Sequence, residues 1–367
     1  MGKLKENKEL LFLYILRCII LLVISAICIL VCVHKTRMLD SQYAWERWKG
    51  DSEAEYAQLS IYLPASASLG PENINSFRNE MMKQFESASI DTANIPFHDA
   101  WSCESSISVT SEKATGTVPV TAVGGSFFDF HPLHLISGHY ISEADTNRAQ
   151  VVLDEELAWF LFGSSDVAGM QMKVGEGTFT VAGVVERESD KASRKAYTAD
   201  MGLFMNYDAY RSVLIAASGA EEPVALPSVS CYEVVMPDPV KNFALNIVNE
   251  KFPAKEKDVV VNSQRFGLAH LASIARNFAA RAISSGVPYP YWENAARYTE
   301  NQVASLSLIS AICLLSPFIF ATATLIRKLV FSNRRLKDIV IPQLIEKTED
   351  IVQTRQRARY LKKHSQQ

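Results

Sequence analysis

Histidine and carboxylate side chains near the middle of the chain are the first candidates for chemistry. His131, His134 and His139 lie close together, with Asp129 beside them. Zinc ligands usually occur as closely spaced pairs that are supported by a second pair or an acid. Here Pro132 and apolar neighbours separate the histidines, which favours a packed turn. We therefore predict no metal site in this segment.

Three adjacent acids, Asp154, Glu155 and Glu156, stand where a short helix is expected to begin. Negative side chains at that place complement the positive end of the helix dipole. They are therefore interpreted as capping residues and not as an acid–base pair. The chain also contains no G-x-x-x-x-G-K-[ST] phosphate-binding loop. We predict a non-enzymatic protein without catalytic residues or cofactor.

Two long apolar segments flank the candidate residues and determine on which side of a membrane those residues lie. Of 367 residues, 48% are hydrophobic and 21% charged, near globular averages, but Leu10–Val33 and Val303–Ile326 are almost wholly apolar. Each is long enough to cross a hydrocarbon core of about 30 Å as a helix. Arg17 lies close enough to one end to reach the membrane surface. The predicted spans are residues 10–33 and 303–327.

The first apolar segment could also be a cleaved signal or a lipoprotein anchor. A signal peptide needs a short apolar region and a small-x-small exit. This segment is longer, and the branched Val31 stands before Cys32 where a small residue would be needed. An uncleaved membrane anchor is the preferred interpretation.

Basic residues predict the orientation of both spans. Arg327, Lys328, Arg334, Arg335 and Lys337 follow the second span, and loops rich in Lys and Arg stay in the cytoplasm. Both termini are therefore expected in the cytoplasm of a plasma-membrane protein, with a large outward-facing domain between the spans. The formal net charge of −3 is too small to indicate nucleic acid as a partner.

A proline-broken segment precedes the second span. Its aromatic residues fit the interfacial belt of a membrane protein, and Glu293 and Arg297 have the i,i+4 spacing of an ion pair on a helix. We predict that it forms an elbow at the membrane interface. The elbow residues are Pro288, Tyr289, Pro290, Tyr291, Trp292, Glu293 and Arg297.

The tail, residues 328–367, carries a short amphipathic pattern followed by a basic end. The apolar positions are predicted to contact a partner: Leu336, Ile339, Val340, Leu344 and Ile345. The basic end could lie on anionic lipid. A solvated, partly frayed helix is the alternative that the composition leaves open.

Between the spans, two strand–helix–strand patterns flank a β-rich middle. Hydrophobic periodicity predicts the first pattern in residues 57–116 and the second in residues 229–263. Segments 34–56 and 264–302 read as helical stalks, the latter broken by prolines. The expected fold class is α+β, and residues 117–228 form its insertion, in which 189–199 is predicted to be an exposed loop.

The middle of the insertion carries the most specific pattern. Phe127-Phe128 is followed by a Gly138–Asp145 segment, a Val151–Leu153 strand, a helix ending in Leu161-Phe162-Gly163, and a Thr180–Val185 strand. This order resembles the periplasmic core domain of the MacB-like (FtsX-like) ABC transporter permeases. The resemblance extends to about Lys337. It implies a split porter-like domain that holds an inserted sabre-like domain.

The resemblance also implies partners. Permeases of this family carry two further spans, so the chain reads as truncated after its second span. We expect a non-catalytic membrane subunit of an export or mechanotransmission complex, paired with an ABC ATPase and a full-length permease, or with its own copies. The alternative is a stand-alone sensor or scaffold that binds an envelope partner without an ATPase.

Two cysteines lie outside the spans, and their state is open. Cys103 and Cys231 could form a bridge in an oxidising compartment, or remain two free thiols. Sequence separation does not decide the geometry that a disulfide needs.

Overall fold

The structure is a computed structural model that describes residues 2–50, 54–92, 97–218, 227–276, 289–331 and 345–357. The chain divides into two compact units. One contains Met1–Leu30 and Leu306–Gln367, and the other contains Val31–Ser305. The second unit holds the folded domain, which we call the ectodomain.

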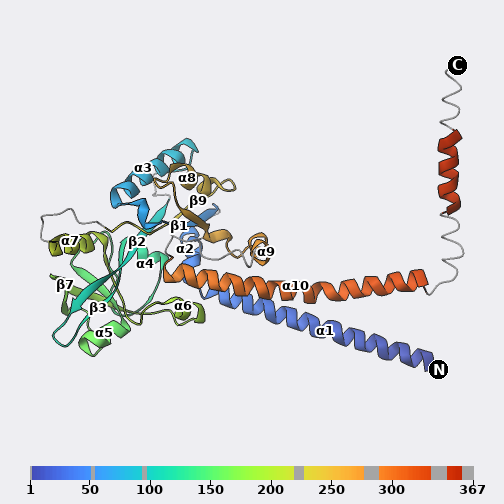
Figure 1. Cartoon of the computed structure of the whole chain (residues 1–367), viewed down its shortest axis with the longest axis horizontal. Coiled ribbons are helices and arrows are strands. Elements are labelled where there is room, and N and C mark those ends of the chain that lie inside the picture. Colours follow the sequence, from blue (N-terminus) through green and yellow to red (C-terminus); the bar gives the residue numbers. More distant parts are fainter. Residues whose placement is uncertain are drawn as a thin grey trace, which may run out of the picture. The chain divides into compact units, whose positions relative to one another are not determined.

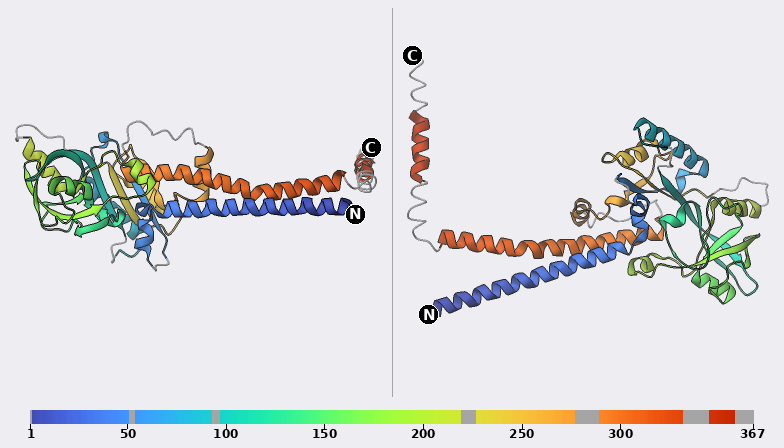
Figure 2. Two further views of the ribbon diagram at one scale, coloured as in Figure 1. Left: turned by 90° about the horizontal axis from the view of Figure 1, so that it is seen from below. Right: turned by 180° about the vertical axis from the view of Figure 1, so that it is seen from behind.

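The first unit is built on residues 2–30 of helix α1 (Gly2–Arg37) and residues 306–331 of helix α10 (Tyr291–Phe331), which lie alongside each other (Figures 1 and 2). The segments Leu11–Arg37 and Tyr291–Ile326 are long and apolar enough to cross a membrane. Ser25 and Ser310 share a 2.7 Å hydrogen bond between the helices. The Tyr14 hydroxyl donates to the carbonyl of Pro317 at 2.9 Å. Most of the remaining apolar side chains on these helices are exposed, as membrane spans require.

The ectodomain contains one ten-stranded sheet, with strand order β10-β1-β9-β2-β3-β8-β5-β7-β4 and β6 beside β2 and β7. Its first four strands come from the two strand–helix–strand patterns, and all three of their pairings are antiparallel. This is the split β-α-β arrangement, and it confirms the expected α+β fold class. Its elements are β1 (Tyr56–Tyr62), α3 (Pro71–Ser87), β2 (His98–Thr110), β9 (Cys231–Pro237), α8 (Phe243–Lys251) and β10 (Asp258–Val261).

The two faces of this sheet bury two different cores, because side chains alternate along a strand. On one face, Leu59 and Ile61 of β1 and Val234 of β9 join the core beneath α3 and α8, which lie side by side (Figure 1). On the other face, Tyr62 and Val235 join a core that includes Trp292 of α10. The beginning of α10 is therefore part of the ectodomain.

The inserted strands continue the same sheet through the long β2–β3 hairpin, so the expected boundary at Thr117 falls inside β3. The Asp154 carboxylate accepts from the Leu157 amide at 2.8 Å, which is the predicted capping role. The inserted elements are β3 (Thr115–Gly125), α4 (Phe127–Phe130), β4 (His134–Gly138), β5 (Gln150–Asp154), α5 (Glu155–Phe162), β6 (Gln171–Val174), β7 (Gly177–Glu186), α6 (Lys191–Ala196), β8 (Leu203–Asn206) and α7 (Tyr207–Ala217).

The prediction that residues 189–199 form an exposed loop is wrong in part. The segment contains α6, whose first amides are capped by the Asp190 carboxylate. Ala192 and Ser193 are buried. A helix of 6 residues is too short to show apolar periodicity, so the cap was its only sequence signal.

The segment after α1 departs from the continuous helical stalk that was expected. After α1 come a 3-10 turn η1 (Asp40–Tyr43) and α2 (Ala44–Lys49), which ends at Gly50 with φ +49. On the other side of the domain, η3 (Asn262–Gln264) and α9 (Leu268–Arg276) follow β10. Residues 277–288 of the second predicted stalk lie outside the described residues. One further short turn, η2, spans Ala65–Ala67.

Cys103 and Cys231 are both free and buried. They face opposite sides of the sheet, since Cys103 belongs to the core under α3 and Cys231 to the core under α10. A disulfide would need both side chains on one side. Burial raises the pKa of the Cys103 thiol to about 12, so the thiol stays protonated and inert at neutral pH.

Candidate functional site: a buried ion cluster at the beginning of helix α10

A buried arginine meets the first turn of α10. Arg265, directly after η3, donates through Nη1 to Glu293 Oε2 at 2.8 Å and through Nη2 to Glu293 Oε1 at 2.6 Å. The side chains are 1% and 0% exposed. Two parallel N–H···O bonds between a guanidinium and a carboxylate fix both the distance and the orientation of the pair.

The remaining donors of Arg265 reach two other parts of the chain. Nε donates to Glu300 Oε1 at 2.7 Å, almost two turns further along α10. Nη1 also donates to Gln42 Oε1 at 2.7 Å, in the η1 turn that follows α1. One guanidinium therefore ties together the segment after α1, the end of the sheet and the first turns of α10.

A second arginine extends the cluster to the sheet edge. Arg297 donates to Glu293 Oε1 at 2.5 Å and to Asp258 Oδ2 of β10 at 2.7 Å. Tyr62 of β1 donates its hydroxyl to Glu293 Oε2 at 2.9 Å. Glu293 thus accepts from Arg265, Arg297 and Tyr62. We call Arg265, Glu293, Glu300, Arg297, Asp258 and Tyr62 the basal ion cluster.

Burial makes this cluster sensitive to the loss of any member. Burial by itself lowers the pKa of Arg265, but the carboxylates of Glu293 and Glu300 outweigh that effect and hold the pKa above its ordinary value. Burial and the negative charge of Glu293 also raise the pKa of Tyr62, so its hydroxyl remains a donor. Each buried charge depends on its partners, since an unpaired one costs several kcal/mol.

Aromatic packing holds the same part of α10 against the sheet. Trp292 is 2% exposed. The centroid of its ring lies 5.7 Å from the ring centroid of Phe127 and 4.4 Å from that of His131. His131 Nε2 is 2.5 Å from Glu233 Oε2, and Ser60 bonds the other oxygen of Glu233 at 2.9 Å. Among the three histidines considered as metal ligands, His131 is thus engaged in a buried polar pair.

The structure places the other two histidines away from that pair. His134 begins β4 and His139 follows it, and both are exposed. Among the described residues, no group of three or more His, Cys, Asp or Glu side chains could hold a metal ion. The residues of the candidate site interact with one another through ion pairs and packed rings.

The elbow residues that the sequence predicted lie together at this site, except Pro288, which is outside the described residues. The i,i+4 pair of Glu293 and Arg297 is formed. Tyr289 and Trp292 are buried inside protein. The Tyr289 hydroxyl donates to Asp258 at 2.7 Å. Whether the segment also lies at a membrane interface stays a prediction.

Sequence reasoning missed Arg265, Glu300, Asp258 and Tyr62. One signal was available. Glu293, Arg297 and Glu300 follow one another at spacings of four and three, which places them on one face of a helix. Charged residues on one face, directly before an apolar span, indicate a buried or paired surface.

The structure describes one of the five predicted partner-contact residues, Ile345. Leu336, Ile339, Val340 and Leu344 lie outside the described residues. Ile345 begins a helical segment at 345–357 and is 52% exposed. The proposed contact role of these five residues remains a prediction.

Comparison with known proteins agrees with the resemblance seen in the sequence. Residues 51–230 match the family model of the MacB-like periplasmic core domain. No curated protein sequence matches the chain.

Three solved structures are similar to parts of the chain. The extracellular domain of the noncanonic ABC-type transporter YknZ from Gram-positive bacteria is 14% identical, with a TM-score of 0.37, over 56% of this chain and 100% of that one. The periplasmic region of MacB from Actinobacillus actinomycetemcomitans is 15% identical, with a TM-score of 0.37, over 62% and 94%. A domain of a putative permease from Porphyromonas gingivalis is 13% identical, with a TM-score of 0.32, over 56% and 88%.

The fold and the matched domain define a class: membrane proteins that carry a MacB-like periplasmic core domain between two apolar helices. Residues 51–230 form the part of the chain that carries this MacB-like periplasmic core domain.

Proposed function

We propose that this chain is a non-catalytic membrane subunit of an ABC-type export or mechanotransmission complex. In this proposal the basal ion cluster is a stiff joint that passes movement between α10 and the ectodomain. The observation that carries the proposal is the buried Arg265, which bonds Glu293 and Glu300 of α10 and Gln42 of η1 through one guanidinium.

A joint of this kind needs contacts that resist rotation and sliding. A single ion pair would let the helix turn about it, whereas bonds at Glu293 and Glu300 hold two successive turns of α10. The rings around Trp292 fill the space beside them. Because α10 continues as one helix to Phe331, a displacement of its apolar part would be carried to these bonds.

The partner in this proposal is an ABC ATPase, working with a full-length permease or with further copies of this chain. A photo-crosslinking residue in place of Ile345, in the full-length protein in its native membrane, tests the contact. We expect an adduct with an ABC ATPase, identified by mass spectrometry. The matched control is the same residue in place of Glu112, in the β2–β3 turn, where no ATPase adduct should form. An Ile345 probe that captures no ATPase contradicts this proposal.

The second candidate function is a stand-alone sensor or scaffold. The exposed Trp159 and Phe160 on α5, which are 53% and 41% exposed, favour an ectodomain that contacts an envelope partner. In that case the Glu112 probe would yield an envelope protein and the Ile345 probe would yield no ATPase.

We further propose that both termini lie in the cytoplasm and the ectodomain outside. A cysteine replacing Glu112 should react with a membrane-impermeant maleimide on intact cells. A cysteine replacing Glu349, in the 345–357 helix, should react only after permeabilisation. The parent chain, whose ectodomain cysteines are buried, gives the background. Labelling of Glu349→Cys on intact cells would reverse the orientation.

A further inference from the structure

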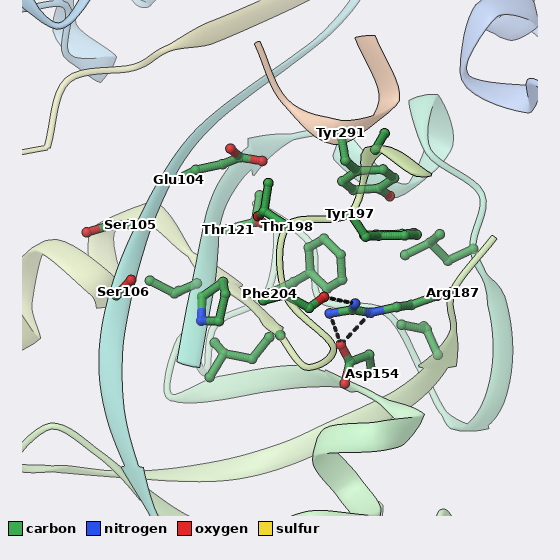
Figure 3. A pocket seen from close by; sticks show the side chains of 18 of the residues that line it. Glu104, Ser105, Ser106, Thr121, Asp154, Arg187, Tyr197, Thr198, Phe204 and Tyr291 are labelled. Atoms are coloured by element: carbon green, nitrogen blue, oxygen red, sulfur yellow. Dashed lines mark hydrogen bonds and ion pairs between the residues drawn. The ribbon is translucent and has the colours of Figure 1, made fainter. Parts of the chain in front are cut away.

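A cavity of about 330 Å³ lies in the ectodomain between the inserted strands and the beginning of α10 (Figure 3). Its walls include Glu104 of β2, the Tyr197–Ala199 segment after α6, and Tyr291 and Asn294 of α10. Its volume falls at the lower end of the range of about 300–1,000 Å³ that is usual for ligand sites. The basal ion cluster does not use Glu104, Tyr197 or Tyr291.

The charges that line the cavity leave one carboxylate without a partner. Arg187 donates through Nε to Asp154 Oδ2 at 2.7 Å and through Nη1 to the Ala199 carbonyl at 2.5 Å, so these two charges balance (Figure 3). The remaining charged lining residue is Glu104. Within the described part of the chain, Glu104 has no ion pair or side-chain hydrogen bond. The lining therefore carries one net negative charge.

Glu104 is placed to meet a ligand inside the cavity. Its carboxylate end extends toward the side where Tyr291 and Thr198 lie (Figure 3). The side chain is accessible, yet the surrounding protein displaces part of its solvating water, and this raises its pKa. A cation bound beside it would replace the lost solvation and favour the charged form.

Aromatic rings form a wall whose orientation is fixed. Tyr197 and Tyr291 stack with centroids 4.3 Å apart. The hydroxyls of both donate to the carboxylate of Glu188, the Tyr291 bond being 3.1 Å long. Phe204 lines the same space. The Arg187 guanidinium already lies over the Tyr197 ring, 4.6 Å from its centroid. Tyr291 and Phe204 therefore offer the aromatic surface of this wall, which attracts cations and also buries apolar surface.

We propose that the cavity binds an organic cation with an apolar body. Its amine or guanidinium group would pair with Glu104, and its body would lie against Tyr291 and Phe204. A carboxylate or phosphate ligand is disfavoured, since the Arg187 donors toward Asp154 and Ala199 are already in use. Because Tyr291 and Asn294 belong to α10, an occupant would contact both the insertion and the helix. That link to α10 rests on the proposed function, but the binding does not.

Binding is tested with 2-phenylethylamine on the full-length protein in phosphatidylcholine nanodiscs, by saturation-transfer NMR with empty nanodiscs subtracted. We expect 2-phenylethylamine to bind, and the uncharged 2-phenylethanol and the anionic phenylacetate to bind at least tenfold more weakly. Glu104→Gln should weaken amine binding about tenfold or more, the loss of one charge-assisted hydrogen bond. Glu112→Gln, a carboxylate on the same hairpin outside the cavity, should leave it unchanged.

A second variant separates the cavity from the charge. Ser106→Trp fills the cavity while keeping Glu104, and it should also reduce amine binding at least tenfold. The inference is overturned if the parent protein does not bind the amine, if Glu104→Gln binds it as tightly as the parent, or if the alcohol binds equally well. Failure here leaves the proposed function untouched, because the photo-crosslinking experiment at Ile345 does not depend on the cavity.

Discussion

Replacement of Arg265 by methionine is expected to lower the free energy of unfolding of the ectodomain by about 3–5 kcal/mol, the cost of leaving buried carboxylates without their partner. Glu293 would lose two of its bonds, and Glu300 would lose its 2.7 Å bond to Arg265. Methionine fills much of the volume of the arginine side chain, so the loss of stability reflects missing charge pairs more than missing packing. The measurement is urea-induced unfolding of the full-length protein in detergent, followed by far-UV circular dichroism.

The matched control is Arg148→Met. Arg148 pairs with Asp208 on the surface, where the two side chains are 44% and 49% exposed. An exposed pair contributes at most about 1 kcal/mol, so this variant should unfold close to the parent. If Arg265→Met also unfolds close to the parent, Arg265 does not hold the joint.

The double variant Arg265→Met, Glu293→Met sharpens the interpretation. Removing both members of a buried pair leaves fewer uncompensated charges than removing one. The double variant should therefore be less destabilised than the sum of the two single variants. Strict additivity would indicate that the two side chains act independently, in conflict with their 2.6 and 2.8 Å bonds.

The order of helices and strands could be predicted from the sequence, because each element carries local signals such as apolar periodicity and capping residues. Pro71 opens α3, and β10 (Asp258–Val261) lies within the second predicted strand–helix–strand pattern, residues 229–263. Hydrophobic periodicity also indicated the two strand–helix–strand patterns that contain β1 and β9. Local periodicity and caps were enough for these parts of the fold.

The candidate site could not be predicted in the same way, because its contacts join residues that are far apart in the sequence. Arg265 and Gln42 are 223 positions apart, and Tyr62 and Glu293 are 231 apart. No local pattern links such residues. The sequence placed Trp292 and Tyr289 in an aromatic segment, but aromatic residues suit a lipid interface and a protein core equally well. What distinguishes the two is the opposing surface, here Phe127 and Tyr62.

That distinction can be measured with two tryptophans that receive the same substitution. Trp292→Ala should lower the free energy of unfolding by about 3–5 kcal/mol, because it opens a cavity between Phe127 and His131. Trp159→Ala removes a ring that is 53% exposed on α5, and it should change stability by no more than about 0.5 kcal/mol. Urea unfolding of both full-length variants, followed by circular dichroism, gives the comparison.

The conservative variant Trp292→Phe tests whether packing is the cause. It keeps an aromatic ring next to Phe127 and leaves a smaller cavity, so it should recover more than half of the loss seen for alanine. If Trp292 faced lipid and not the ectodomain, alanine at this position would leave the urea transition of the ectodomain unmoved. A transition that shifts for Trp292→Ala and not for Trp159→Ala places the first turn of α10 inside the folded domain, which a joint between helix and ectodomain requires.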